Sequence, residues 1–191
     1  MAVARYASAA GGTYVPVMAG SDPAWIAALR ARDEDAWRAL HDREFPFLYR
    51  FALGMGADAA LAEDAASEAF TRLVRSVGRL DLDSESSLRA WLLVVCRNYL
   101  RDQIRRTGRV QNGMPDHVAP EPALDTRLAL NAAIARLAEA QREVIVLRFM
   151  NGLPTKEVAA LTKRGVEAVE SLQHRALGAL RRALGPEWED A

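Results

Sequence analysis

The chain is poor in cysteine and histidine, and this scarcity excludes several kinds of site. Cys96 is the only cysteine among 191 residues, so no internal disulfide can form. It lies within an apolar run, where a buried thiol with a packing role is expected, and a chain without disulfides fits the reducing cytoplasm. The three histidines, His41, His117 and His174, lie in unrelated segments without cysteine or carboxylate at metal-ligand spacing.

Signatures of catalysis and of membrane insertion are also missing from the sequence. It contains no Gly-rich phosphate loop and no recognisable pair of nucleophile and base, so we expect neither an enzyme nor a bound cofactor or metal. No apolar run reaches bilayer-spanning length, and the first residues lack the apolar core of a signal peptide. We therefore expect a cytoplasmic protein that does not insert into a membrane.

The chain has no net charge, because Lys plus Arg and Asp plus Glu each number 25. A protein that coats nucleic acid without sequence preference is usually strongly basic. Half of the residues are apolar and 26% are charged, which is a globular composition. A neutral total with local clusters of charge indicates separate surfaces for an acidic and a basic partner.

Helical periodicity runs through most of the sequence without β-type alternation, which predicts an all-α fold. We expect a mobile tail at 1–21 and two small helical domains at 22–106 and 126–185. Residues 107–125 contain two Gly and three Pro and few large apolar side chains. This composition predicts a flexible linker between the two domains.

Capping residues divide the first domain into helices. Asp33 can cap a helix that Gly54 and Gly56 end, and Pro46 should bend or break that helix. Asp58 can cap a third helix at 59–77. This helix exposes three carboxylates and one arginine: Glu63, Asp64, Glu68 and Arg72. The like charges of Asp64 and Glu68, one helical turn apart, are unfavourable unless a basic partner faces them.

Residues 88–106 read as one helix with an apolar first half and a basic second half. The second half carries arginines four residues apart: Arg97, Arg101 and Arg105. This spacing places them along one slowly turning face. The guanidiniums can follow phosphates, Trp91 can stack on a base, and Asn98 can contact a base edge. The alternative is a solvated basic face on an ordinary core helix.

The second domain contains the pattern of a helix-turn-helix. A short helix at 155–162 and a turn at 163–165 precede an amphipathic helix at 166–184. Polar residues of the turn and of the outer face of the second helix are candidates for contacting DNA: Lys163, Arg164, Glu167, Glu170, Ser171, His174 and Arg175. Many αα-hairpins share this pattern, so alone it leaves a structural hairpin open.

Four segments in this order resemble the extracytoplasmic-function group of bacterial RNA polymerase sigma factors. They are residues 35–52, 62–73, 88–106 and 141–159. A Pro-containing linker separates the third segment from the fourth, as in the family, and the resemblance extends from about Asp33 to Leu184.

The resemblance implies a sigma factor that binds core RNA polymerase and directs initiation at specific promoters. The helix with Glu63, Asp64, Glu68 and Arg72 would dock on the polymerase clamp. Promoter melting and minus-ten recognition would involve Trp91, Arg97, Asn98, Arg101 and Arg105. The loop at 81–87 would form part of a pocket for an extruded base. The helix-turn-helix would contact the minus-thirty-five element, and the family leaves open an anti-sigma protein as a further partner.

Departures from the family pattern leave the role of Glu170 open. Glu170 and Leu172 stand where many members carry basic residues. Glu170 either favours the positive end of its helix or accepts a hydrogen bond from a cytosine amino group.

The alternative to a sigma factor is an autonomous helix-turn-helix regulator without a polymerase partner. This alternative gives the acidic pair of Asp64 and Glu68 and the arginine row no role.

Overall fold

The computed structural model describes residues 23–82, 84–107 and 129–185, and within these ranges the chain forms helices joined by turns. The helices are α1 (Pro23–Arg30), α2 (Glu34–Gly54), α3 (Ala59–Ser76), α4 (Glu85–Thr107), α6 (Glu139–Ile145), the π-helix η1 (Val146–Met150), α7 (Thr155–Thr162) and α8 (Val166–Leu184). Residues 129–135 are helical as well. No strand occurs in these ranges, so the all-α prediction is confirmed. The predicted tail at 1–21 and residues 108–125 of the predicted linker lie outside the described residues.

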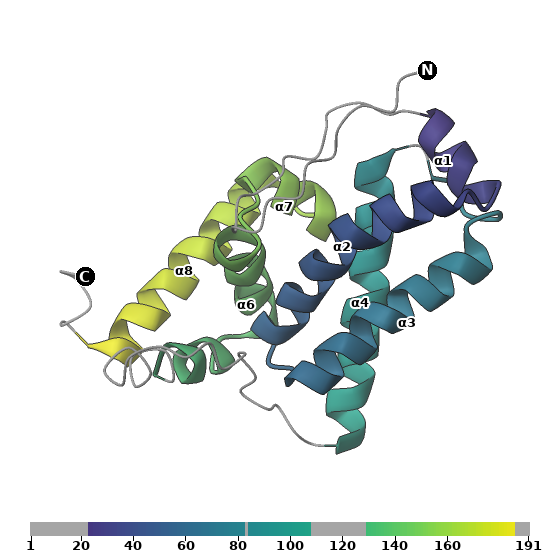
Figure 1. The fold of residues 1–191 in the computed structure, drawn as a ribbon. Coiled ribbons are helices and arrows are strands. Elements are labelled where there is room, and N and C mark those ends of the chain that lie inside the picture. The colour runs from purple at the N-terminus through teal and green to yellow at the C-terminus, as the bar shows by residue number, and fades with distance from the viewer. Residues whose placement is uncertain (1–22, 83, 108–128, 186–191) are drawn as a thin grey trace.

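Helices α1–α4 form the first bundle, in which α2, α3 and α4 pack against one another and α1 packs on α2 (Figure 1). The two predicted N-caps are present. The Asp33 carboxylate accepts a hydrogen bond from the Ala36 N–H, and that of Asp58 from the Leu61 N–H, both at 2.8 Å. These bonds satisfy N–H groups that the first helical turn leaves without an intrahelical acceptor.

Pro46 does not break α2, which was one of the two outcomes that the sequence predicted. The helix is continuous from Glu34 to Gly54. Pro46 is exposed, so its ring lies on the solvent side and water can reach the carbonyl group that loses its N–H partner. Phe47 and Leu48, which follow directly, are buried in the apolar core. This packing stabilises the helix on the C-terminal side of Pro46.

The second bundle consists of residues 129–135 and α6–α8. Helices α7 and α8 have the predicted bounds and are joined by the predicted turn, in which Lys163 adopts a left-handed conformation with φ 55°. The Lys163 N–H donates to the carbonyl groups of Ala159 and Ala160, which closes the end of α7. Gly165 occupies the N-cap position of α8, as its place in the sequence predicts.

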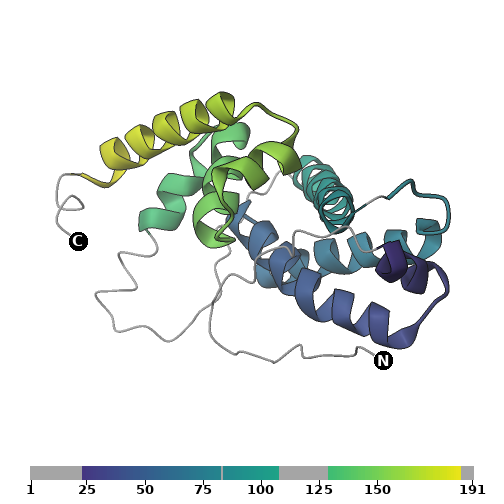
Figure 2. The ribbon, with the colours of Figure 1, turned by 90° about the horizontal axis from the view of Figure 1, so that it is seen from above.

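The two bundles pack against each other, which the sequence did not predict. Figures 1 and 2 show α7 beside α4, and η1 also contacts α2. Buried Val146 and Leu147 belong to the same apolar cluster as Phe51 of the first bundle. Gly54 permits this approach, because a Cβ there would lie 2.7 Å from both Cγ atoms of Val146. The side-chain amide of Asn151 adds a polar tie by donating to the Phe47 carbonyl at 2.9 Å.

Candidate nucleic-acid interface

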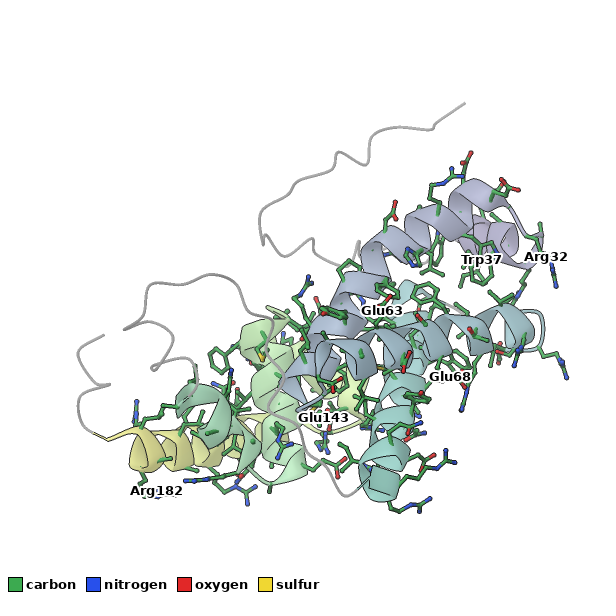
Figure 3. All side chains as sticks on the ribbon, turned by 60° about the horizontal axis from the view of Figure 1, so that its bottom comes forward. Arg32, Trp37, Glu63, Glu68, Glu143 and Arg182 are labelled. Carbon is green, nitrogen blue, oxygen red and sulfur yellow. The ribbon has the colours of Figure 1, made fainter. Side chains whose placement is uncertain are left out.

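The outer face of α3 carries the predicted acidic cluster. Glu63 and Asp64 are exposed, and half-buried Glu68 follows one turn after Asp64. Figure 3 labels Glu63 and Glu68 on this helix. Arg72 donates from Nε to Glu68 Oε1 at 2.7 Å, and the two side chains are 51% and 31% exposed. Because one arginine faces three carboxylates, the cluster keeps an excess of negative charge, as the sequence indicates.

A buried ion pair fixes α4 on α2, and sequence reasoning missed it. Arg89 Nε lies 2.7 Å from Glu44 Oε2, and Arg89 Nη2 lies 2.8 Å from Glu44 Oε1. The side chains are 7% and 2% exposed, and the guanidinium also lies over the Phe47 ring. The two parallel bonds set the rotation of α4 about its axis, because a bidentate pair tolerates little change in geometry. Glu44 stands between buried Leu40 and Leu48 on one helical stripe, and that position was the signal.

The arginine row of α4 faces carboxylates of the second bundle. Arg97 Nη1 lies 2.8 Å from Glu143 Oε1, and Arg101 pairs through Nη2 with Glu139. The hydrogen bond and charge of Glu139 raise the pKa of Arg101 above its ordinary value. Arg105 instead lies near Asp102 of its own helix, at 3.4 Å.

Glu143 is the junction of this contact. Its carboxylate is 3% exposed and accepts from Arg97 of α4 through Oε1 and from Arg164 of the turn through Oε2, at 2.8 and 2.9 Å. Figure 3 labels Glu143 where α6 meets α4. Neither Glu143 nor Glu139 was predicted, because their partners on α4 lie 46 and 38 residues away in sequence.

The other two minus-ten candidates differ in exposure. Asn98 is exposed, one residue after Arg97. Trp91 is half-buried and packs against the apolar cluster that the two bundles share. The Asn98 amide is therefore accessible at the surface, whereas part of the Trp91 ring is committed to packing.

The structure brings most of the helix-turn-helix candidates together on one exposed surface. The exposed residues are Lys163, Glu167, Glu170, Ser171, His174 and Arg175. Arg164 is separated from them, because it is half-buried and bound to Glu143. Val169 and Ala176 are buried on the inner side of α8, so the predicted division of this helix into two faces is confirmed.

Two further properties limit the chemistry of the described part of the chain. It holds no cluster of His, Cys, Asp and Glu suited to a metal ion, and none of its helices is long and apolar enough to cross a membrane. Cys96 is buried, as predicted, and burial raises the pKa of its thiol to about 12.

Comparisons with known proteins identify both bundles. The Sigma-70 region 2 family matches residues 40–110, and the Sigma-70 region 4 family matches residues 127–180. The ECF RNA polymerase sigma factor SigL of Mycobacterium tuberculosis is 33% identical over 170 residues, which make up 83% of this chain and 94% of SigL. BldN of Streptomyces coelicolor, also an ECF sigma factor, is 30% identical over 166 residues, or 81% of this chain and 62% of BldN.

A solved structure has a similar fold. CnrH, in complex with the cytosolic domain of CnrY, matches with a TM-score of 0.67 at 24% identity. The match covers 86% of this chain and 97% of CnrH. The match covers both bundles and shows similarity of fold alone.

Proposed function

Since this chain belongs to the extracytoplasmic-function group of RNA polymerase sigma factors, we propose roles for the surfaces described above. The protein is an initiation factor that binds core RNA polymerase and selects promoters. An autonomous regulator is not favoured, because it would have no use for a region 2 domain. We place its action in the cytoplasm, and we assign it no catalytic role of its own.

The acidic face of α3 is the proposed docking surface for polymerase. Glu63, Asp64 and Glu68 keep an excess of negative charge at the surface, although Arg72 neutralises part of it. Such a cluster is unfavourable in the free chain and becomes favourable against a basic surface.

The proposed minus-ten surface is the basic half of α4, with Asn98 contacting a base and Arg97, Arg101 and Arg105 following phosphates. Trp91, about two helical turns before Asn98 on α4, is the proposed stacking residue next to this surface. In the free chain Arg97 and Arg101 are bound to carboxylates of the second bundle. Each of these arginines donates from one Nη atom to a carboxylate, and a phosphate competes for the same positive charge, so we propose that promoter binding is coupled to separation of the bundles.

The exposed face of α8, with the turn before it, is the proposed minus-thirty-five surface. Separation of the bundles would also release Arg164 from Glu143 and add a cation to this surface. We accordingly propose that residues 22–106 and 126–185 act as two promoter-binding domains. An anti-sigma protein is a further proposed partner, which would have to cover one of these surfaces or hold the bundles together.

The observation that carries this assignment is the excess of carboxylates on α3 next to a helix with a row of arginines. The test is run-off transcription with core polymerase and the Glu68→Lys variant. We expect loss of polymerase binding and of transcripts with an unchanged circular-dichroism melt. Asp42→Lys, at an exposed carboxylate of α2, is the matched control and should remain active. Equal polymerase affinity of both variants and the unaltered chain would refute the docking role.

A further inference from the structure

Two ion pairs between the bundles have matched spacing on the two helices that form them. Arg97 and Arg101 lie one helical turn apart on α4, and Glu139 and Glu143 lie one turn apart on α6. Arg97 pairs with Glu143 at 2.8 Å and Arg101 pairs with Glu139, so α6 runs along the arginine row in the opposite direction. Carboxylates and phosphates offer the same kind of anionic oxygen to a guanidinium. Helix α6 therefore occupies the row in the way that a strand of phosphates would.

The two ion pairs differ in their exposure to water. The Arg97 and Glu143 side chains are 24% and 3% exposed, whereas those of Arg101 and Glu139 are 57% and 55% exposed. Water and salt weaken an exposed ion pair and act much less on a pair that is shielded from them. The hold of α6 over the arginine row therefore depends on Glu143.

Three residues that join the bundles leave a buried polar atom without a partner. Besides Arg97, they are Arg142, whose Nη1 donates to the Met55 carbonyl at 3.1 Å, and Asn151, whose amide donates to the Phe47 carbonyl. Within the described residues, Nε of Arg97, Nε of Arg142 and Oδ1 of Asn151 have no hydrogen-bond partner. Such a group is destabilising while it is buried, and water satisfies it once the bundles part. The closed arrangement is therefore balanced close to opening.

The ionic part of the contact also favours a contact that opens. A buried ion pair is often no more stable than apolar side chains packed in the same space, so a permanent contact gains little from it. Charged side chains are well solvated after separation, whereas an apolar surface of the same size would be left facing water. The buried carboxylate of Glu143, held between Arg97 and Arg164, suits two bundles that must come apart.

Helix α6 continues without a break into η1, which carries the apolar part of the same contact. Val146 directly follows Ile145, the last residue of α6, and both Val146 and Leu147 are buried in the apolar cluster that the bundles share. The π-helix begins at the residue that meets Gly54. One continuous segment, 139–150, thus supplies the carboxylates and the apolar surface, and opening withdraws both together.

We propose that α6 is an autoinhibitory element, which in the free chain occupies the arginine row of α4 and keeps single-stranded DNA from it. The proposal rests on the minus-ten role proposed above and adds that the chain itself supplies the competitor. The affinity for a strand is reduced in proportion to the fraction of chains that are open. Glu63 and Asp64 of α3 stay exposed in the closed arrangement, so the inhibition concerns DNA and leaves the proposed polymerase surface accessible.

The test locks the contact and measures binding of a short fluorescent oligothymidine strand by the full chain. A Cβ at residue 54 would lie 2.7 Å from both Cγ atoms of Val146, so Gly54→Cys with Val146→Cys brings two thiols into disulfide range. The oxidised chain should lose strand binding, and reduction should restore it without any change in charge. Gly54→Cys alone, treated in the same way, should bind the strand under both conditions. A locked chain that binds as tightly as the reduced one would overturn the proposal.

A second variant opens the contact without a crosslink. Glu143→Gln should bind the strand at least about 5-fold more tightly than the unaltered chain, at the low end of the usual coupling between two sites. Asp42→Asn removes the same charge from an exposed position of α2 and should leave the affinity unchanged. Equal affinity of these two variants would overturn the proposal, and so would strand binding by none of the chains. Absence of run-off transcripts from the unaltered chain with core polymerase would instead contradict the sigma-factor function.

Discussion

Replacing Gly54 by alanine is expected to drive the two bundles apart while each remains folded. The added Cβ would lie 2.7 Å from Cγ1 and Cγ2 of Val146 and 2.8 Å from the Met150 Sδ atom. Carbon atoms in contact normally lie about 3.5–4.0 Å apart, so Val146 must retreat by roughly 1 Å. Rotation about χ1 gives little relief, because both methyl groups of this β-branched side chain crowd the new atom.

The expected free-energy change has two parts of opposite sign. Overpacking of this kind costs about 1–3 kcal/mol, and here the cost falls on the contact between bundles. Alanine in place of glycine favours a helix by about 1 kcal/mol, and this gain belongs to α2 in either arrangement. A cost of about 2 kcal/mol would change the ratio of closed to open chains by roughly 30-fold.

Small-angle X-ray scattering and amide hydrogen exchange measure this change. Gly54→Ala should increase the radius of gyration and the exchange rate over η1, without loss of helical circular dichroism. Gly178→Ala is the matched control, because its Cβ would meet nothing closer than Arg182 Nη1 at 3.6 Å, and it should leave both readings unchanged. A Gly54→Ala chain as compact and as protected as the unaltered one would refute the argument.

Three further predictions concern charged residues. Glu143→Gln should weaken the contact between the bundles by about 1–3 kcal/mol, a moderate loss because Arg97 is 24% exposed and can be resolvated, as urea unfolding would measure. Arg101→Ala should flatten the salt dependence of promoter binding by about 0.9, and an unchanged slope would place this arginine away from phosphates. Glu170→Gln, scored on a minus-thirty-five library with intact polymerase, should lose preference at one base pair. A uniform change across the library with a lower melting temperature would leave only its effect on the helix dipole.

Signals that act within one helical turn predicted the bounds of α7 and α8 and the two N-caps. Helices α7 and α8 have the expected bounds because a left-handed residue and a glycine between them act within one turn of the chain. The caps at Asp33 and Asp58 follow from equally short-range hydrogen bonds. The outer face of α8 could be listed from helical periodicity alone.

Contacts between distant segments could not be predicted in this way. Glu44 and Arg89 are 45 residues apart and meet only because α2 packs on α4. Glu143 has an ordinary place in an amphipathic pattern, and nothing local connects it with Arg97. The composition of residues 107–125 predicts separated domains, whereas the apolar surfaces of Val146 and Leu147 are buried against the first bundle. The arginine row was found from sequence, but the carboxylates that occupy it were not.

The burial of Cys96 provides a kinetic reporter within the first bundle. Thiol reagents attack the thiolate, and burial raises the pKa of the Cys96 thiol so far that very little thiolate exists at pH 7. Reagent must also reach a side chain that the folded bundle encloses. Labelling therefore proceeds through molecules in which the bundle has opened, and its rate measures the free energy of that opening. Because no other cysteine exists in the chain, each labelled molecule records one such event in α4.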